Sequence, residues 1–160
     1  PRHSKSEFAS TFFPAWMMGL NPSLKIIQAT HTAELAVRFG RRVRNIIDSE
    51  DYQSVFPNIS LSGDNKSAGR WTTNDGGEAF YSGVGGAITG RGADLLIIDD
   101  PHSEQDAMSP TAMDGAWEWY TSGPRQRLQP GGTIILVMTR WSTKDLAVRL
   151  LKRQSKTHAG

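Results

Sequence analysis

The sequence predicts an α/β protein in which helices flank a mostly parallel β-sheet. Segments rich in apolar residues, typical of buried strands, occur at 25–29, 94–99 and 132–138, and the second contains a continuous apolar run. Helical periodicity or helix-start signals lie between these segments and after the last one. Alternation of strands and helices favours parallel strands joined by helical crossovers.

Composition restricts the possible functions. The 160 residues suffice for about one domain, and 38% hydrophobic with 21% charged residues is typical of a globular domain. No run of 18 apolar residues occurs, so we expect no membrane span. Cysteine is absent, which excludes disulfides, thiolate metal sites and cysteine nucleophiles. The net charge is only +2, but basic residues cluster in two runs, which we interpret as solvated helix faces, with phosphate contacts as the alternative: Arg38, Arg41, Arg42 and Arg44, then Arg149, Lys152, Arg153 and Lys156.

The first elements of the chain are a helix, a strand and a second helix. Residues 7–20 are rich in apolar and aromatic side chains and predict a buried helix, with a kink or an early break at Pro14. The strand at 25–29 follows a turn. Thr30 or Thr32 caps the next helix, whose apolar positions recur at helical spacing: Leu35, Phe39, Val43 and Ile46.

The middle of the chain predicts a small antiparallel β insertion. Residues 51–58 are interpreted as a connector, and Asn-Asp-Gly-Gly at 74–77 is typical of a hairpin turn. Glycines within 85–92 form a loop, so the insertion and the loop together occupy about 55–92. The strands expected there are 59–62, 70–73 and 78–83.

The last part of the chain returns to alternating strands and helices. The run at 94–99 suits a central parallel strand. Ser109 followed by Pro110 is a strong helix start, with serine as the cap and proline at the first helical position. After the strand at 132–138, Ser142 is expected to cap a final helix, because an aspartate three residues later gives capping-box-like spacing.

The chain opens with Pro-Arg-His-Ser-Lys-Ser at the start of the first helix. A phosphate-binding loop needs backbone N–H groups aimed at phosphates, a lysine on the β- and γ-phosphates, and a hydroxyl on magnesium. Lys5 and Ser6 supply the last two, so the predicted ATP-binding residues are Arg2, His3, Ser4, Lys5 and Ser6. Glycine usually stands where Ser4 does, and the first glycine and the preceding strand of the pattern are not among the 160 residues. The alternative is a basic helix N-terminus without a ligand.

Two acids end the central strand. Strand ends of a parallel sheet lie at its carboxyl edge, where ligands bind. Asp99 is therefore a candidate for holding Mg²⁺ through water, together with Ser6. Asp100 is a candidate for orienting or activating the attacking water. An acidic turn, Asp-Asp-Pro, is the alternative interpretation.

Thr139 follows the next buried strand and is a candidate for sensing the γ-phosphate, with a capped strand end as the alternative. The three constellations occur in the order phosphate loop, acidic strand and polar strand end. Their joint occurrence favours a P-loop nucleoside triphosphatase over any of the separate alternatives.

Other reactive side chains do not form sites. Ser4 and Ser6 lack His and Asp partners arranged for a hydrolase triad. The four histidines are scattered without metal-ligand spacing: His3, His31, His102 and His158. Three neighbouring aromatic side chains are interpreted as core residues rather than a base-stacking platform: Trp117, Trp119 and Tyr120.

The sequence resembles the large terminase subunit of tailed bacteriophages, the motor that packages DNA into the capsid. The resemblance implies a P-loop fold of the additional-strand type. It also implies that the chain is a partial ATPase domain, 1–160, whose first strand is missing. The matching segments are 1–7, 25–47, 83–103, 117–132 and 135–141.

The resemblance assigns roles to individual residues. Lys5 corresponds to the phosphate-loop lysine and Ser6 to the magnesium hydroxyl. Asp99 corresponds to the magnesium-side aspartate, and Asp100 to the catalytic carboxylate, which is more often glutamate. Thr139 corresponds to the threonine that couples hydrolysis to DNA movement.

Two arginines complete the assignment. Arg2 resembles the phosphate-loop arginine that acts on the γ-phosphate. Arg91, ahead of the acidic strand, is the candidate for an arginine that reaches the nucleotide of a neighbouring subunit. Nothing after Trp141 supplies the acidic cluster of a terminase nuclease, so we expect the nuclease domain to be absent.

The resemblance also implies a biological setting. ATP and Mg²⁺ are the expected cofactors, and double-stranded DNA, the portal protein of the procapsid and the small terminase subunit are the expected partners. The full-length parent would form a homo-oligomeric ring in the host cytoplasm at the portal, absent from the mature virion and from membranes. We expect the isolated 160 residues to hydrolyse ATP poorly or not at all.

Two alternative functions remain open. One is a helicase-like P-loop translocase. The other is a degenerate P-loop module that binds DNA phosphates without hydrolysis, and Ser4 motivates it.

Overall fold

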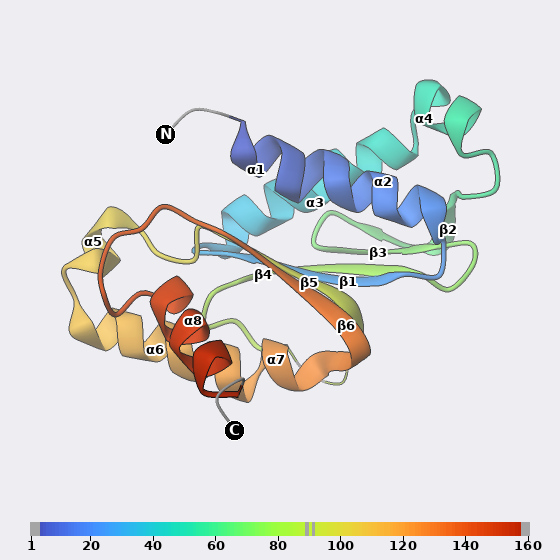
Figure 1. Ribbon diagram of the computed structural model, residues 1–160. Helices are drawn as coiled ribbons and strands as arrows, with labels where there is room; N and C mark the ends of the chain where they lie inside the picture. Colours follow the sequence, from blue (N-terminus) through green and yellow to red (C-terminus); the bar gives the residue numbers. More distant parts are fainter. Residues whose placement is uncertain (1–3, 89, 91, 158–160) are drawn as a thin grey trace.

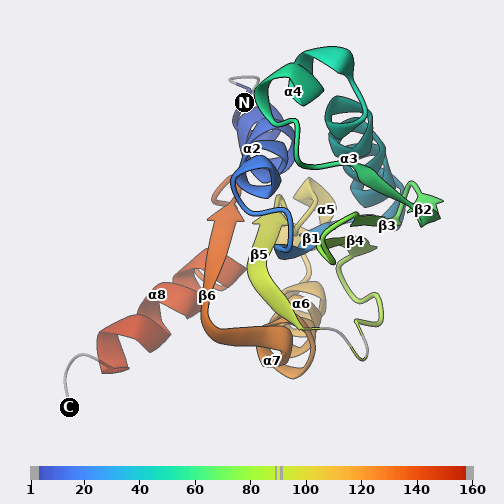
Figure 2. The same cartoon turned by 90° about the vertical axis from the view of Figure 1, so that its right-hand side faces the viewer.

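The described strands form a single sheet in the computed structural model, which describes residues 4–88, 90 and 92–157. Their spatial order is β2-β3-β4-β1-β5-β6 (Figure 2). The neighbours β4, β1, β5 and β6 run parallel, whereas β3 is antiparallel to both of its neighbours. The predicted α/β class with a mostly parallel sheet is confirmed. The strands are β1 (Lys25–Thr30), β2 (Leu61–Ser67), β3 (Arg70–Thr73), β4 (Glu78–Gly83), β5 (Ala93–Asp99) and β6 (Leu128–Val137).

Helices cover both faces of this sheet (Figure 1). One face carries α1 (Lys5–Glu7), the π-helix η1 (Phe8–Phe12), α2 (Phe13–Leu20), α3 (Ala33–Ile47) and α4 (Glu50–Val55). The opposite side carries α6 (Pro110–Ser122), α7 (Pro124–Arg127) and α8 (Leu146–Thr157), with the short α5 (Glu104–Ala107) before them. None of the described helices combines the length and the hydropathy that a membrane span requires.

The central strands are apolar on both sides because each side faces a separate core. In β5, Leu95 and Ile97 pack into the core under α2 and α3, and Leu96 and Ile98 into the core over α6 and α8. Successive side chains of a strand point to opposite faces, so a strand between two helical layers needs a continuous apolar run. Trp119 and Tyr120 lie in the second core, which confirms their interpretation as core residues.

The first helix is continuous through Pro14. Proline lacks an N–H donor and its ring crowds the preceding turn, which is why the sequence predicted a kink or an early break. A π-helical turn, η1, instead precedes Pro14, and the helix continues to Leu20. Such wider turns are one of the recognised ways in which a helix accommodates an irregularity.

The strands predicted as an antiparallel insertion do pair antiparallel, but they belong to the main sheet. β4 pairs in parallel with β1, with Ile26 opposite Ala79, so β2 and β3 extend the sheet at one edge. The turn at 74–77 is present, and a Cβ at Gly77 would lie only 2.2 Å from the carbonyl oxygen of Pro22. Glycine is therefore required where this turn passes the start of β1.

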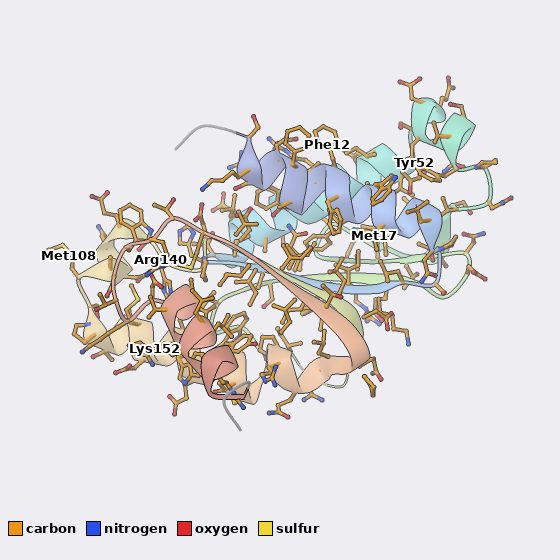
Figure 3. The ribbon with its side chains drawn as sticks, in the orientation of Figure 1. Phe12, Met17, Tyr52, Met108, Arg140 and Lys152 are labelled. Carbon is orange, nitrogen blue, oxygen red and sulfur yellow. The ribbon has the colours of Figure 1, made fainter. Side chains whose placement is uncertain are left out.

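The interpretation of 51–58 as a connector is wrong, because α4 occupies most of it. Ser49 caps α4 by accepting a hydrogen bond from the N–H of Tyr52. The Tyr52 hydroxyl then donates to the carbonyl oxygen of Ala15 at 2.7 Å, which ties α4 to α2 (Figure 3). The cap and the buried ring together stabilise a helix too short to persist alone.

Two of the predicted helix starts are confirmed and one is wrong. Thr32 caps α3 and Ser109 caps α6, each through its side-chain oxygen. The last helix begins at Leu146, and its cap is Asp145 rather than Ser142, because Asp145 Oδ1 accepts the N–H of Val148 at 3.0 Å.

Candidate nucleotide and metal site

The three predicted constellations converge at the carboxyl edge of the sheet. Strand register places Thr30, Asp99 and Val137 side by side at the ends of β1, β5 and β6. The first helix begins at the same edge, because Ser6 Oγ donates a 3.1 Å hydrogen bond to Asp99 Oδ1 across 93 positions of sequence. The structure therefore brings the first turn of this helix to the acidic strand end.

Asp99 is a buried carboxylate held by two hydroxyl groups. Its side chain is 2% exposed, and Ser10 Oγ donates to Oδ2 at 2.7 Å while Ser6 occupies Oδ1. Burial raises the pKa of Asp99, and the negative charge of Asp100 adds to this, whereas the two serine hydrogen bonds and the positive charge of Lys5 oppose it. A cation placed beside Asp99 would stabilise its charged form.

The donor set fits a hard divalent cation. A serine hydroxyl and a carboxylate are oxygen ligands of the kind that Mg²⁺ prefers, and Mg²⁺ in phosphate-binding sites usually takes few protein ligands. Within the described part of the chain, no group of three or more His, Asp or Glu side chains is arranged to enclose a metal. Ser6 and Asp99 therefore suit a cation that takes its other ligands from phosphate and water.

Ser4 has the backbone conformation that a glycine would adopt most easily. Its φ is +55°, in the left-handed region, and its carbonyl oxygen accepts the N–H of Phe8 at 3.0 Å. Phosphate loops commonly have glycine at this position, and the φ value gives the physical reason. The exposed Lys5 follows it at the first position of the helix, where unpaired N–H groups favour anions.

Asp100 is tied to the end of β6. Its N–H donates to the carbonyl oxygen of Val137 at 2.8 Å, and its Oδ1 accepts the N–H of Thr139 at 2.9 Å. Asp100 also has a left-handed backbone, with φ of +41°. The turn after β5 and the turn after β6 are therefore one connected unit.

Among the predicted site residues, Arg2, His3 and Arg91 lie outside the described part of the chain.

Sequence reasoning missed a second connection to this unit. Asp145 is fully buried, and its Oδ2 accepts from Arg140 Nε at 3.0 Å and from the N–H groups of Trp141 and Ser142. Burial tends to raise the pKa of Asp145, but its hydrogen bonds from the main chain and Arg140 lower it overall. Asp145 therefore fixes the loop that carries Thr139.

His102 joins the same loop to the acidic strand. It is 4% exposed, three residues after Asp99, and its Nε2 accepts the N–H of Leu146 at 3.4 Å. Burial lowers the pKa of His102, which keeps the ring neutral and able to accept this hydrogen bond. The sequence contained no spacing signal for this contact, because it joins two turns far apart in the chain.

An apolar groove of about 580 Å³ lies beside the site, between the first helix and β6. Among the described residues that line it, Lys5 is the one charged side chain, so the groove has the wrong chemistry for phosphates. Its other lining residues come from the first helix and from β6: Phe8, Ala9, Phe12, Phe13, Trp16, Ile135 and Val137.

Comparison with known proteins places the fold but not the family. No family model matches the sequence, and no curated protein matches it. Among solved structures, the chain is similar to the crystal structure of the HK97 bacteriophage large terminase, with a TM-score of 0.57 and 14% sequence identity. The alignment covers 98% of this chain and 31% of that protein, so this chain spans about a third of its length. The fold of this chain is thus similar to that of a part of a phage large terminase.

Proposed function

We propose that this chain is the ATPase motor part of a phage terminase large subunit, which hydrolyses ATP with Mg²⁺ to drive double-stranded DNA into a procapsid. The hydrogen bond between Ser6 and Asp99 carries the proposal. It joins the hydroxyl expected of a phosphate loop to the acid expected on the metal side, although the two are 93 positions apart. The fold similarity to the HK97 large terminase supports the same proposal.

The binding half of the proposed site is the start of the first helix. Main-chain N–H groups of its first turn donate to the phosphates, and the Lys5 ammonium contacts the β- and γ-phosphates. The Ser6 hydroxyl and the Asp99 carboxylate hold Mg²⁺, which when bound neutralises charge on the phosphate oxygens. Asp99 acts through its negative charge, since its burial leaves little room for direct contact with ATP.

The hydrolytic half is the pair of turns after β5 and β6. Oδ1 of Asp100 accepts the N–H of Thr139, so Oδ2 remains to accept a hydrogen bond from the attacking water. Thr139 is held at the strand end by that bond, and its proposed role is to respond to the γ-phosphate. Arg2 and Arg91 are proposed to stabilise charge on the transferred phosphoryl group, Arg91 from a neighbouring subunit.

The proposed partners are those that a DNA-packaging motor requires. They are double-stranded DNA, the portal protein and the small terminase subunit, with further copies of the protein in a ring at the procapsid in the host cytoplasm. Folds of this kind support many functions, so these partners depend on the motor assignment rather than on the sheet itself.

The decisive experiment is phosphate release by the full-length protein, with and without DNA, for Lys5→Ala. We expect turnover to fall by at least about 100-fold, because the variant lacks the positive charge that contacts the transferred phosphate. Lys25→Ala is the matched control, since Lys25 is an exposed lysine at the start of β1, at the opposite edge of the sheet. Unchanged DNA-stimulated hydrolysis in Lys5→Ala would contradict the site assignment.

A second candidate function is a module that binds DNA phosphates and does not hydrolyse ATP. Asp100 favours it, because aspartate is one methylene shorter than the usual glutamate and one of its oxygens is already engaged. Calorimetry with Mg·ATP and with duplex DNA separates the two functions. DNA binding without tight Mg·ATP binding supports the module, and tight Mg·ATP binding with turnover supports the motor.

A further inference from the structure

Ser10 is a second serine on the candidate metal-side aspartate, one helical turn beyond Ser6. It lies in the π-helical turn η1, is fully buried, and donates to Asp99 Oδ2 at 2.7 Å. Its carbonyl oxygen accepts Gln28 Nε2 at 3.1 Å, from β1. Ser10 is thus anchored to one strand by its main chain and to the neighbouring strand by its side chain.

The two oxygens of Asp99 have different surroundings. Oδ1 accepts from Ser6, which is half-buried, whereas Oδ2 accepts from Ser10, which water does not reach. The terminal torsion of an aspartate is soft, so one hydrogen bond leaves the carboxylate plane free to turn. A second donor on the other oxygen fixes the plane and sets the direction in which Oδ1 points.

We propose that Ser10 is a positioning residue that holds Asp99 Oδ2 so that Oδ1 faces Ser6 and the divalent cation. The inference rests on the proposed function, because it assumes that a cation binds beside Ser6. Outer-shell partners of metal-ligating carboxylates commonly have this role. Wider helical turns are also frequent at functional sites, and η1 is the turn that carries Ser10.

Thr11 shows that burial alone does not account for this contact. It follows Ser10 in the same turn and is 1% exposed, yet its hydroxyl has no hydrogen-bond partner within the described residues. A buried hydroxyl in η1 is therefore tolerated without a partner. The hydroxyl of Ser10, in contrast, is directed at the acid of the site.

The test is the Mg²⁺ dependence of ATP hydrolysis by the full-length protein at saturating ATP. For Ser10→Ala we expect the half-saturating free Mg²⁺ concentration to rise about tenfold or more, as for other outer-shell deletions. Thr11→Val is the matched control, because it also removes one buried hydroxyl and nearly preserves shape. We expect its Mg²⁺ dependence to equal that of the wild type. Equal Mg²⁺ dependence of Ser10→Ala and Thr11→Val would overturn the role of Ser10.

Additional variants separate the possible failures. If Ser10→Ala does not fold by circular dichroism, Ser10→Cys keeps the volume with a weak donor, and an unchanged Mg²⁺ dependence there overturns the inference. If Ser6→Ala shifts the Mg²⁺ dependence and Ser10→Ala does not, only the inference about Ser10 fails. If the wild type binds Mg·ATP without turnover, calorimetric titration with Mg²⁺ replaces the rate measurement with the same expected shifts. If the wild type neither hydrolyses nor binds Mg·ATP, the proposed function and the inference fail together.

Discussion

The main-chain N–H of Thr139 donates a 2.9 Å hydrogen bond to Oδ1 of Asp100, which joins the turn after β5 to the turn after β6. The bond gives Asp100 two separable functions. Its Oδ1 accepts the N–H of Thr139, and the negative charge of the carboxylate is available for chemistry. Substitutions that remove one function and keep the other can therefore distinguish them.

Asp100→Asn keeps the acceptor and removes the charge. Asparagine also tolerates the left-handed backbone of this position, where φ is +41°. We expect an unchanged melting temperature and a loss of turnover of about 100-fold or more, the usual range for removing a general base. Phosphate release and thermal unfolding measure the two effects. Wild-type turnover in this variant would exclude Asp100 as the base, and Asp100→Ala, which also loses the bond to Thr139, should melt at a lower temperature.

Ser4→Gly tests why serine is accepted in the loop. Non-glycine residues pay roughly 1–2 kcal/mol for a left-handed backbone, and glycine avoids that cost. We expect Ser4→Gly to bind Mg·ATP as well as or better than the wild type. Ser4→Val should bind at least about tenfold more weakly, because a branched side chain strains this conformation further. Calorimetry compares the three, and equal affinity for Ser4→Val would show that the conformation does not matter for binding.

Asp145→Ala removes the cap of α8 and the anchor of the loop that carries Thr139. Three main-chain N–H groups and Arg140 lose their acceptor. We expect the free energy of unfolding to fall by about 2–3 kcal/mol, as when a cap and a buried acceptor are lost together. Urea unfolding measures it. Asp114→Ala is the control, since its ion pair with Arg149 is exposed and should contribute less than about 1 kcal/mol.

His102 and Asp145 should each lower the free energy of unfolding as the pH falls, whereas protonation of Asp99, whose pKa is raised, should oppose that loss. Burial lowers the pKa of His102 below 6.5, so the unfolded chain takes up a proton first, and stability is lost as the pH falls from about 7 through the folded pKa. Asp145 has a pKa below 3.8 in the folded state, so its contribution is present above that value and is lost at still lower pH. Thermal unfolding from pH 8 to below the folded pKa of Asp145 records both losses.

His102→Gln isolates the first of these losses. Glutamine keeps an acceptor for the N–H of Leu146 but does not titrate. We expect its melting temperature to change less than that of the wild type between pH 7.5 and 5.5. Parallel curves for the two proteins would show that His102 does not contribute to the pH dependence.

The parts of the fold that were predictable depend on local pattern. The apolar run of β5, the caps Thr32 and Ser109, and the order of the three constellations are all visible in short windows of sequence. Covering both faces of a strand requires consecutive apolar residues, and capping requires a short polar side chain, so these signals survive without a structure.

The parts that could not be predicted depend on contacts between distant segments. The parallel pairing of β4 with β1 places the insertion within the main sheet, and hairpin patterns carry no information about a third strand. Asp145, rather than Ser142, became the cap because the loop folds back toward Arg140 and His102. Ser10 has a weak signal, since it lies four positions after Ser6 and hence on the same helix face. That spacing became meaningful only when Asp99 was found opposite both.

The outer edge of β6 has consequences for handling the protein. No strand of the described chain pairs with this edge, which is at the margin of the sheet (Figure 2) and borders the apolar groove. Such edges promote strand-to-strand association unless charge, proline or cover protects them. β6 has a proline only near its start, Pro130, and Lys5 is the one charged side chain among the described residues that line this groove. We therefore expect the isolated 160 residues to associate as their concentration rises, which light scattering over a dilution series would detect. Hydrolysis rates measured on this chain alone would then depend on its degree of self-association as well as on the chemical step.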